Sequence, residues 1–257
     1  MKRGKQYRSY LEAIDKDKKY TINQACQLLK DNTFAKFDES VEVAFKLGID
    51  PKQADQAVRG TLSLPHGTGK DVRIVVICSD SDIKAAEEAG AIEVGSDELV
   101  DKIAKGFLDF DIVIATPAMM GKVGKLGKLL GARGMMPSPK SGTVTQDVAK
   151  TVTEFKSGKV EYRNDKAGIV HIVIGKASFS QDKLVENFRE LYDTIQKIKP
   201  QKAKGTYIQS LVVSTTMSPA LNLCPVKTKK SQQISDTLTG ICTTDCDPST
   251  NVMICFF

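Results

Sequence analysis

The segment between Val72 and Ala115 constrains the fold most strongly, because short runs typical of buried strands alternate in it with helical patterns. VRIVVIC at Val72–Cys78 and DIVIA at Asp111–Ala115 are apolar and rich in β-branched residues, and a shorter run spans Ile92–Val94. Buried strands joined by helices are typical of βαβ units around a parallel sheet. The middle of the chain is therefore predicted to form a parallel α/β layer.

A glycine-rich basic stretch, GKVGKLGKLLGARGMMPSPK, begins at Gly121, within the helix expected from about Pro117. It contains no GxGxxG pattern, so it does not predict a dinucleotide cradle. Lys122, Lys125 and Lys128 are predicted to form one basic stripe on a helix, and Gly131–Pro139 is predicted to be the loop that ends it. A solvated helix face is the preferred interpretation, and contact with tRNA or another RNA is the alternative.

The two flanks of the chain have a different pattern, in which strands carry one polar face. Val41, Val43, Phe45 and Leu47 alternate with more polar residues, as in a half-buried strand. The other elements expected in the flanks are a hairpin of Lys159–Arg163 with Gly168–Ile174, an amphipathic helix at Phe179–Ile198, and a final strand at Thr206–Met217.

Two glycine-rich joints, His66–Gly69 and Ser157–Gly158, separate these patterns. The predicted fold class is α/β with two domains. A split α+β domain takes residues 1–67 and 159–222 from both chain ends, and a Rossmann-like parallel α/β domain is inserted at residues 68–158. The joints would form a paired hinge between the domains. Residues 223–257 are expected to be an atypical, disordered tail.

Composition favours a soluble globular protein. The chain of 257 residues has a formal net charge of +6 and 41% hydrophobic residues, without any apolar run near the length of a membrane span. The polar, basic N-terminal segment lacks the apolar core of a signal peptide, which predicts a cytoplasmic protein without a membrane partner. The charge is compatible with nucleic acid but does not establish it.

The six cysteines give no strong metal signal. Cys26 and Cys78 lie in apolar-patterned segments and are predicted to be buried thiols. Cys242 and Cys246 could contribute two zinc ligands, but no histidine follows Cys224 and no second close pair exists. A loose tail with free thiols is the preferred interpretation.

The sequence offers little to an enzyme. Gly69-Lys70 lacks the earlier glycine of a P-loop, and Asp71 stands where a serine or threonine is required. The two histidines, His66 and His171, belong to no nucleophile or metal spacing and are interpreted as a loop and a sheet-face residue. We expect no catalytic residue, metal or cofactor. A nucleotide-binding α/β enzyme remains the alternative.

Polar faces on two expected strands suit an RNA partner, since hydroxyls can bind phosphates and ribose 2′-hydroxyls. An ordinary solvated sheet face accounts for the pattern equally well. The residues concerned are Ser40 and Glu42, and Ser210, Ser214 and Thr216, with positive charge from Lys36, Arg163, Lys166 and Lys176 if these strands share one sheet.

Ordered motifs from about residue 2 to residue 222 then indicate a family. They include KFDESVE at Lys36–Glu42, LGIDP at Leu47–Pro51, LPHGTG at Leu64–Gly69, RNDK at Arg163–Lys166 and GKASF at Gly175–Phe179. In these motifs the chain resembles the bacterial L-one family of ribosomal proteins, from the mobile stalk of the large subunit. The resemblance implies binding to stalk helices of 23S ribosomal RNA, help in releasing deacylated exit-site tRNA, and translational repression through the chain's own operon messenger RNA.

The resemblance also implies an RNA surface. Carried over by position, it comprises Lys36, Phe37, Ser40, Glu42, Asp165, Lys166, Ser178, Ser210, Thr216, Met217 and Ser218. Phe37 has an alternative as a core anchor, because it shares parity with Val41. Ser218 departs from the family's glycine, and its Cβ would weaken RNA binding unless the backbone there is ordinary.

Overall fold

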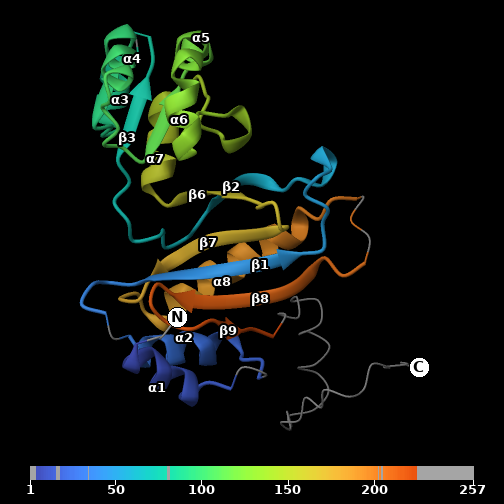
Figure 1. Ribbon diagram of the computed structural model, residues 1–257. Helices are drawn as coiled ribbons and strands as arrows, with labels where there is room; N and C mark the ends of the chain where they lie inside the picture. The colour runs from blue at the N-terminus through green and yellow to red at the C-terminus, as the bar shows by residue number, and fades with distance from the viewer. Residues whose placement is uncertain are drawn as a thin grey trace, which may run out of the picture. The chain divides into compact units, whose positions relative to one another are not determined.

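The computed structural model (Figure 1) describes residues 4–15, 18–33, 35–79, 82–201, 203 and 205–224. By their contacts these described residues belong to one compact unit. Residues 225–257 of the predicted tail, with Cys242, Cys246 and Cys255, lie outside the described residues.

An antiparallel sheet unites strands from both ends of the chain. Its order is β7-β1-β8-β9, with β1 paired to both β7 and β8. Burial alternates strictly along β1, so one face of the sheet enters the core and the other stays outside. The strands are β1 (Ser40–Leu47), β7 (Ile169–Lys176), β8 (Ile208–Thr215) and β9 (Leu221–Asn222).

Helix α8 (Gln181–Lys197) covers the inner face of this sheet and lies behind it in Figure 1. Ser180 caps its first turn, and the fully buried Phe188 stacks on Phe45 of β1 with ring centroids 6.4 Å apart. Helix α2 (Ile22–Asp31) packs against α8 and begins with a capping box. Helix α1 (Lys5–Ala13) precedes it, and the Tyr10 hydroxyl donates to the Leu28 carbonyl at 2.9 Å.

A second, parallel sheet has the order β4-β3-β5. Because β3 is buried at every position, helices cover both faces. One face packs on α4, α5 and α6, and the other on α3 and α7. The elements are β3 (Ile74–Ile77), β4 (Glu93–Gly95), β5 (Ile112–Ala115), α3 (Ile83–Glu88), α4 (Asp97–Ala104), α5 (Met120–Val123), α6 (Gly127–Arg133) and α7 (Val148–Lys156). The predicted parallel α/β layer is confirmed.

The predicted hairpin of Lys159–Arg163 with the next strand is wrong. Strand β6 (Lys159–Arg163) pairs instead with β2 (Arg59–Ser63) in a separate two-stranded sheet, and the pairing toward β7 is reduced to an isolated bridge between Asn164, just after β6, and Val170. Although β6 and β7 are adjacent in sequence, they therefore belong to different sheets, and the turn between them carries the chain from one sheet to the other. A short 3₁₀ turn, η1 (Ala54–Gln56), precedes β2.

The helix expected after Pro117 is broken into short pieces: η2 (Pro117–Met119), α5, η3 (Gly124–Leu126) and α6. Lys122, Lys125 and Lys128 are all exposed, and Lys122 pairs with Asp97. The helix ends at Arg133 rather than before Gly131, because Gly134 adopts the left-handed conformation that terminates it, with φ of 74°. A further 3₁₀ turn, η4 (Pro139–Ser141), follows.

Three further predictions concern the cysteines, the last strand and membrane spans. Cys26 and Cys78 are buried thiols, as predicted, and burial raises the pKa of Cys26 to about 11. The strand Thr206–Met217 is shorter than predicted and is not the final one, since β9 follows β8. In the described part of the chain we find no helix with the length and apolar character to span a bilayer.

Candidate nucleic-acid interface

The outer face of the antiparallel sheet gathers polar residues from both chain ends. Glu42 lies opposite Ser214, and Lys46 lies opposite Ser210, across the β1–β8 ladder. Residues paired in this way point to the same face. Ser40, Glu42 and Lys46 on β1 therefore share one surface with the hydroxyls of β8.

One end of this face, which we call the Ser40 cluster, consists of segments 35–40, 176–178 and 215–218. Its strands are joined by side chains as well as by the ladder. The Ser40 amide donates to Thr216 Oγ1 at 3.1 Å, and Lys176 Nζ donates to Ser40 Oγ at 3.1 Å. Both the hydroxyl of Thr216 and that of Ser40 are thus held in place before any ligand binds.

Asp38 fixes the neighbouring segment of the Ser40 cluster. Its carboxylate accepts the amide of Ser178 at 3.1 Å and the hydroxyl of Ser178 at 2.7 Å. Because the Ser178 hydroxyl donates its hydrogen bond to Asp38, it can act toward a ligand only as a hydrogen-bond acceptor. Such an acceptor suits a ribose 2′-hydroxyl or a base amine rather than a phosphate.

Two large apolar side chains stand out from this polar cluster. Phe37 is 55% exposed and Met217 is 46% exposed. The alternative that Phe37 anchors the core is therefore wrong, because residues 36 and 37 form a bend before the strand begins. An exposed aromatic ring beside hydroxyls and cations can stack on a nucleobase.

Ser218 closes the turn that follows β8. Its hydroxyl accepts the Thr215 amide at 2.9 Å and donates to the Pro219 carbonyl at 3.2 Å. The hydroxyl is therefore committed within the turn, and the Ser218 amide also donates to the Thr215 carbonyl at 3.3 Å, so what Ser218 has left to offer a ligand is its backbone carbonyl.

The remaining predicted residues lie at the other end of the sheet. Ser210 pairs with Lys46, six residues along β1 from Ser40, or about 20 Å at the usual rise of a strand. Asp165 and Lys166 form the turn before β7, where Asp165 Oδ1 accepts the Lys166 amide at 2.6 Å. The eleven predicted residues thus form two groups on one sheet, with Glu42 between them.

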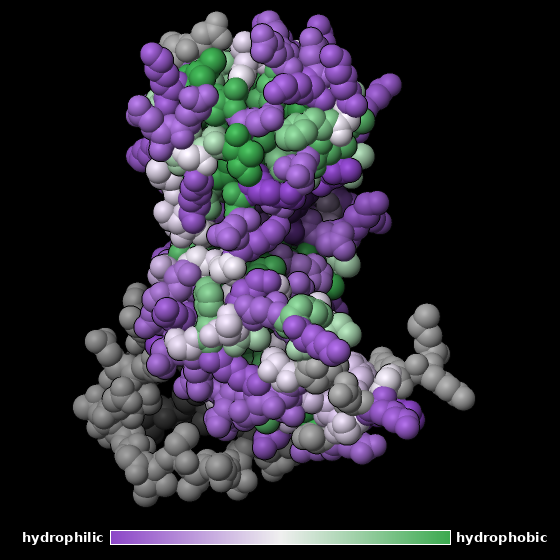
Figure 2. All heavy atoms as spheres, turned by 90° about the vertical axis from the view of Figure 1, so that its left-hand side faces the viewer, coloured by the Kyte–Doolittle hydropathy of each residue, from purple (hydrophilic) through white to green (hydrophobic). Residues whose placement is uncertain are grey.

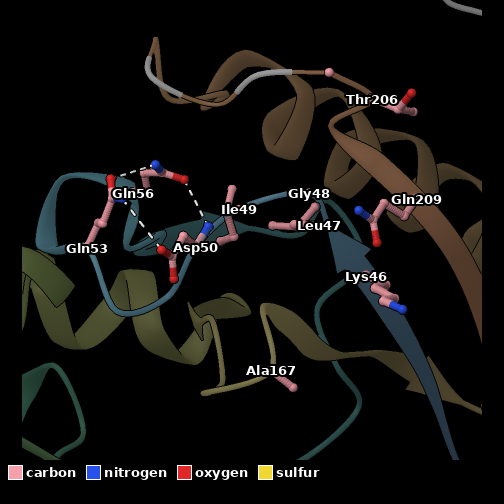
Figure 3. Close-up of a pocket in the computed structure, with 11 residues that line it drawn as sticks. Lys46, Leu47, Gly48, Ile49, Asp50, Gln53, Gln56, Ala167, Thr206 and Gln209 are labelled. Carbon is pink, nitrogen blue, oxygen red and sulfur yellow. Dashed lines mark hydrogen bonds between the residues drawn. The ribbon is translucent and has the colours of Figure 1, made fainter.

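An open depression of about 1200 Å³ adjoins this second group (Figure 3). Lys46, Thr206 and Gln209 lie on one side of it, while Asp50, Gln53 and Gln56 lie on the other and bond to one another. In the described part of the chain the side-chain amide of Gln209 has no hydrogen-bond partner. Its free amide can both donate and accept, which suits the edge of a base.

The lysines on the outer face differ in whether their ammonium groups already have a partner. Within the described ranges, the ammonium groups of Lys36, Lys46 and Lys166 have no hydrogen-bond or ion-pair partner, and so they are available to phosphates. Figure 2 views the molecule from the end that carries the Ser40 cluster, and the lower part of this surface is mainly hydrophilic. No group of three potential metal ligands occurs among the described residues.

Sequence reasoning missed Glu39. This residue is 2% exposed and its carboxylate lies beneath the Ser40 cluster. A signal existed, because Glu39, Val41 and Val43 alternate with outward residues, which places a carboxylate on the buried side of the strand's extension. Buried acids are rare without partners, so such a position indicates a structural or functional role.

The polar sheet face, free lysines and exposed aromatic ring are the properties of a nucleic-acid-binding protein. The sequence comparison then gives the family: the model of the Ribosomal protein L1p/L10e family matches residues 29–219. The chain belongs to this family, as the resemblance predicted. It is therefore a structural, ribosome-associated cytoplasmic protein that binds ribosomal RNA, and its family is not one of enzymes.

Proposed function

We propose that this chain is a constituent of the large ribosomal subunit that binds 23S ribosomal RNA at the mobile stalk beside the tRNA exit site. The observation that carries the proposal is the outer sheet face, where the Ser40 cluster presents fixed hydroxyls together with Phe37 and Met217. Family membership supports the RNA partner. The stalk position follows from the family resemblance in the motifs.

Two kinds of side chain on the sheet have different roles in binding. Free lysines neutralise phosphates, which supplies affinity without distinguishing one sequence from another. Hydroxyl and carboxylate acceptors such as Ser178 and Glu42 engage 2′-hydroxyls and base amines, which distinguishes RNA from DNA. Together they read the shape of a folded RNA rather than a linear sequence.

We further propose the two-domain arrangement, with residues 68–158 inserted into a domain built from residues 1–67 and 159–222. In its support, the parallel sheet contains strands of the insert alone, whereas the antiparallel sheet contains strands from outside it. The joints His66–Gly69 and Ser157–Gly158 act as a paired hinge, so that the insert moves with the stalk as deacylated tRNA leaves.

The test of the site is binding of a stalk-helix RNA fragment to Thr216→Val and Met217→Ala variants. Each should weaken binding by about 1 kcal/mol, the net value of one hydrogen bond or a comparable contact. Thr153→Val and Leu129→Ala are matched controls, since both side chains are exposed on helices of residues 68–158. Unchanged affinity of both site variants would refute the proposed surface.

We also propose that the same surface represses translation of the chain's own operon messenger RNA. A messenger leader that mimics the stalk site would then compete with the stalk fragment for the protein. Thr216→Val should weaken both RNAs by a similar factor. Simultaneous binding of both RNAs would separate repression from this surface.

A further inference from the structure

Glu39 connects the three segments of the Ser40 cluster from beneath. Its Oε1 accepts the amide of Ala35 at 3.3 Å, and its Oε2 accepts the amide of Met217 at 3.4 Å. Its own carbonyl accepts the amide of Ala177 at 2.8 Å. A single residue thus bonds the segment before β1, the segment after β7 and the turn after β8.

The carboxylate achieves this without a cation. Among the described residues no lysine, arginine or histidine forms an ion pair with Glu39, although the residue is 2% exposed. A buried carboxylate is unfavourable unless hydrogen bonds compensate it. The two amides therefore stabilise the buried carboxylate, and the carboxylate in turn fixes the two segments. If either segment moved away, the buried charge would lose a hydrogen-bond donor.

The direction of the neighbouring side chains indicates that Glu39 supports the Ser40 cluster and does not itself contact a ligand. Asp38 and Ser40 flank Glu39, and their side chains accept hydrogen bonds from the Ser178 hydroxyl and from Lys176 Nζ. Glu39 points to the buried side between them. It cannot reach a ligand on the outer face, but the backbone positions of Phe37 and Met217 depend on the segments that it bonds.

We propose that Glu39 is a positioning residue for RNA binding, which holds the segments carrying Phe37 and Met217 in the arrangement that the RNA requires. The proposal rests on the proposed RNA surface. A segment that is ordered before binding loses less conformational entropy in the complex, and so binds more tightly. Without the carboxylate, residues 35–38 and 216–218 must be ordered by the RNA itself.

The experiment measures binding of the full chain to the stalk-helix fragment after Glu39→Gln. Glutamine keeps the size but offers one acceptor oxygen, and its amide group faces an N–H donor. We expect roughly tenfold weaker affinity, or about 1.4 kcal/mol, with most of the change in the dissociation rate. Glu190→Gln, an exposed position on α8, is the matched control and should bind like the parent.

Amide hydrogen exchange supplies a readout that a general loss of stability would not give. In free Glu39→Gln, exchange at Ala35 and Met217 should accelerate, while the amides of β1, β7 and β8 keep their protection. Glu39→Asp provides a second variant that retains the charge but is too short to reach both amides, and it should behave in the same direction. Loss of protection throughout the sheet in both variants would contradict a positioning role.

A double-mutant cycle with Met217→Ala tests the route of the effect. If Glu39 acts by placing Met217, the double variant should lose less affinity than the sum of the two single variants. Strict additivity would overturn the inference, as would parental affinity in Glu39→Gln. If Met217→Ala and Thr216→Val themselves leave affinity unchanged, it is the RNA surface that fails, and the two failures are thereby distinguished.

Discussion

Single side chains in the Ser40 cluster differ in whether they serve the fold or a ligand, and Ser218 illustrates the first case. Its hydroxyl bonds the Thr215 amide and the Pro219 carbonyl, so the turn after β8 is closed from within. A glycine at this position would lack the Cβ and so allow the backbone of the turn more conformations, but it would lose both hydrogen bonds of the hydroxyl. The serine therefore exchanges backbone freedom for an internally stabilised turn.

Ser218→Gly and Ser218→Ala should both lower the free energy of unfolding by about 1 kcal/mol, because each leaves the Thr215 amide without its partner. Glycine should cost more than alanine, since it adds conformational freedom to the unfolded chain. Urea denaturation measures both values. Equal stability of all three proteins would show that the Ser218 hydroxyl contributes nothing to the turn.

Asp111 carries a pH-dependent contribution to stability. Burial raises the pKa of its carboxyl, but hydrogen bonds from Lys70 and Arg73 outweigh this, so the pKa lies below its ordinary value. A lowered pKa in the folded state stabilises the protein above the unfolded pKa of about 3.9 and ceases to do so as the pH falls through the folded value.

Asp111→Asn should therefore lower the free energy of unfolding at pH 7 by about 1 to 2 kcal/mol. The difference from the parent should shrink as the pH falls below about 4. Thermal or urea unfolding across this range measures it. Asp109→Asn is a useful comparison, because Asp109 is more exposed and pairs with Arg73 alone. A difference independent of pH would contradict the ion-pair explanation.

The alternation of buried and exposed residues along β1 predicts the orientation of some residues of the Ser40 cluster correctly and of others wrongly. Val41 to Leu47 face the core in every second position, as the sequence indicated. Counting back by twos places both Glu39 and Phe37 inward, yet only Glu39 is buried. Alternation holds only where the backbone is extended, and the bend at residues 36 and 37 releases Phe37 to the surface.

At the scale of elements, the end of β1 and the start of β8 combine a free lysine with a free amide. Lys46 and Gln209 both line the depression in Figure 3, and the predicted residue Ser210 pairs with Lys46. If RNA extends across the sheet to this end, the lysine should contact phosphate and the amide should contact a base or ribose. These contacts differ in their dependence on salt.

Lys46→Gln should weaken binding of the stalk fragment and reduce the slope of log K against log salt by about one phosphate. Gln209→Ala should weaken binding by about 1 kcal/mol without changing that slope, because a neutral amide releases no counterion. Fluorescence anisotropy at several salt concentrations measures both. Parental affinity in both variants would confine the RNA to the Ser40 cluster.

Elements were predictable where local pattern decides them and not where distant pairing does. The apolar runs around Ile74–Ile77 and Ile112–Ala115 determine buried strands by themselves. The sheet that β6 joins depends on β2, about 100 residues earlier in the chain, and the intervening turn at Asn164 fits a hairpin equally well. The polar face was predictable strand by strand, but its division into two groups needed the register.

For the whole molecule, the two joints lie against each other. A Cβ added to Gly158 would come 2.4 Å from the Cα of Gly67, and Gly158 has a φ of 107°, so glycine is required there. The fully buried Asn187 of α8 holds the first joint, since its side chain accepts the His66 amide at 3.1 Å and donates to the Gly67 carbonyl at 3.0 Å. The chain thus leaves the proposed RNA-binding domain and re-enters it at one place.

Replacement of residues 69–156 by a short glycine-serine linker should consequently leave a cooperatively folding protein. Its affinity for the stalk fragment should stay within about twofold of the parent, because sites far apart influence each other by only about 0.3 to 0.5 kcal/mol. The salt slope decides the role of Lys122, Lys125 and Lys128, which are exposed and lie in the deleted segment. An unchanged slope would identify their stripe as a solvated face, as we expect, whereas a smaller slope would mean that these lysines neutralise phosphates of the same RNA. Loss of cooperative unfolding in the shortened chain would instead contradict the division into two domains, because the remaining residues would then lack a core of their own.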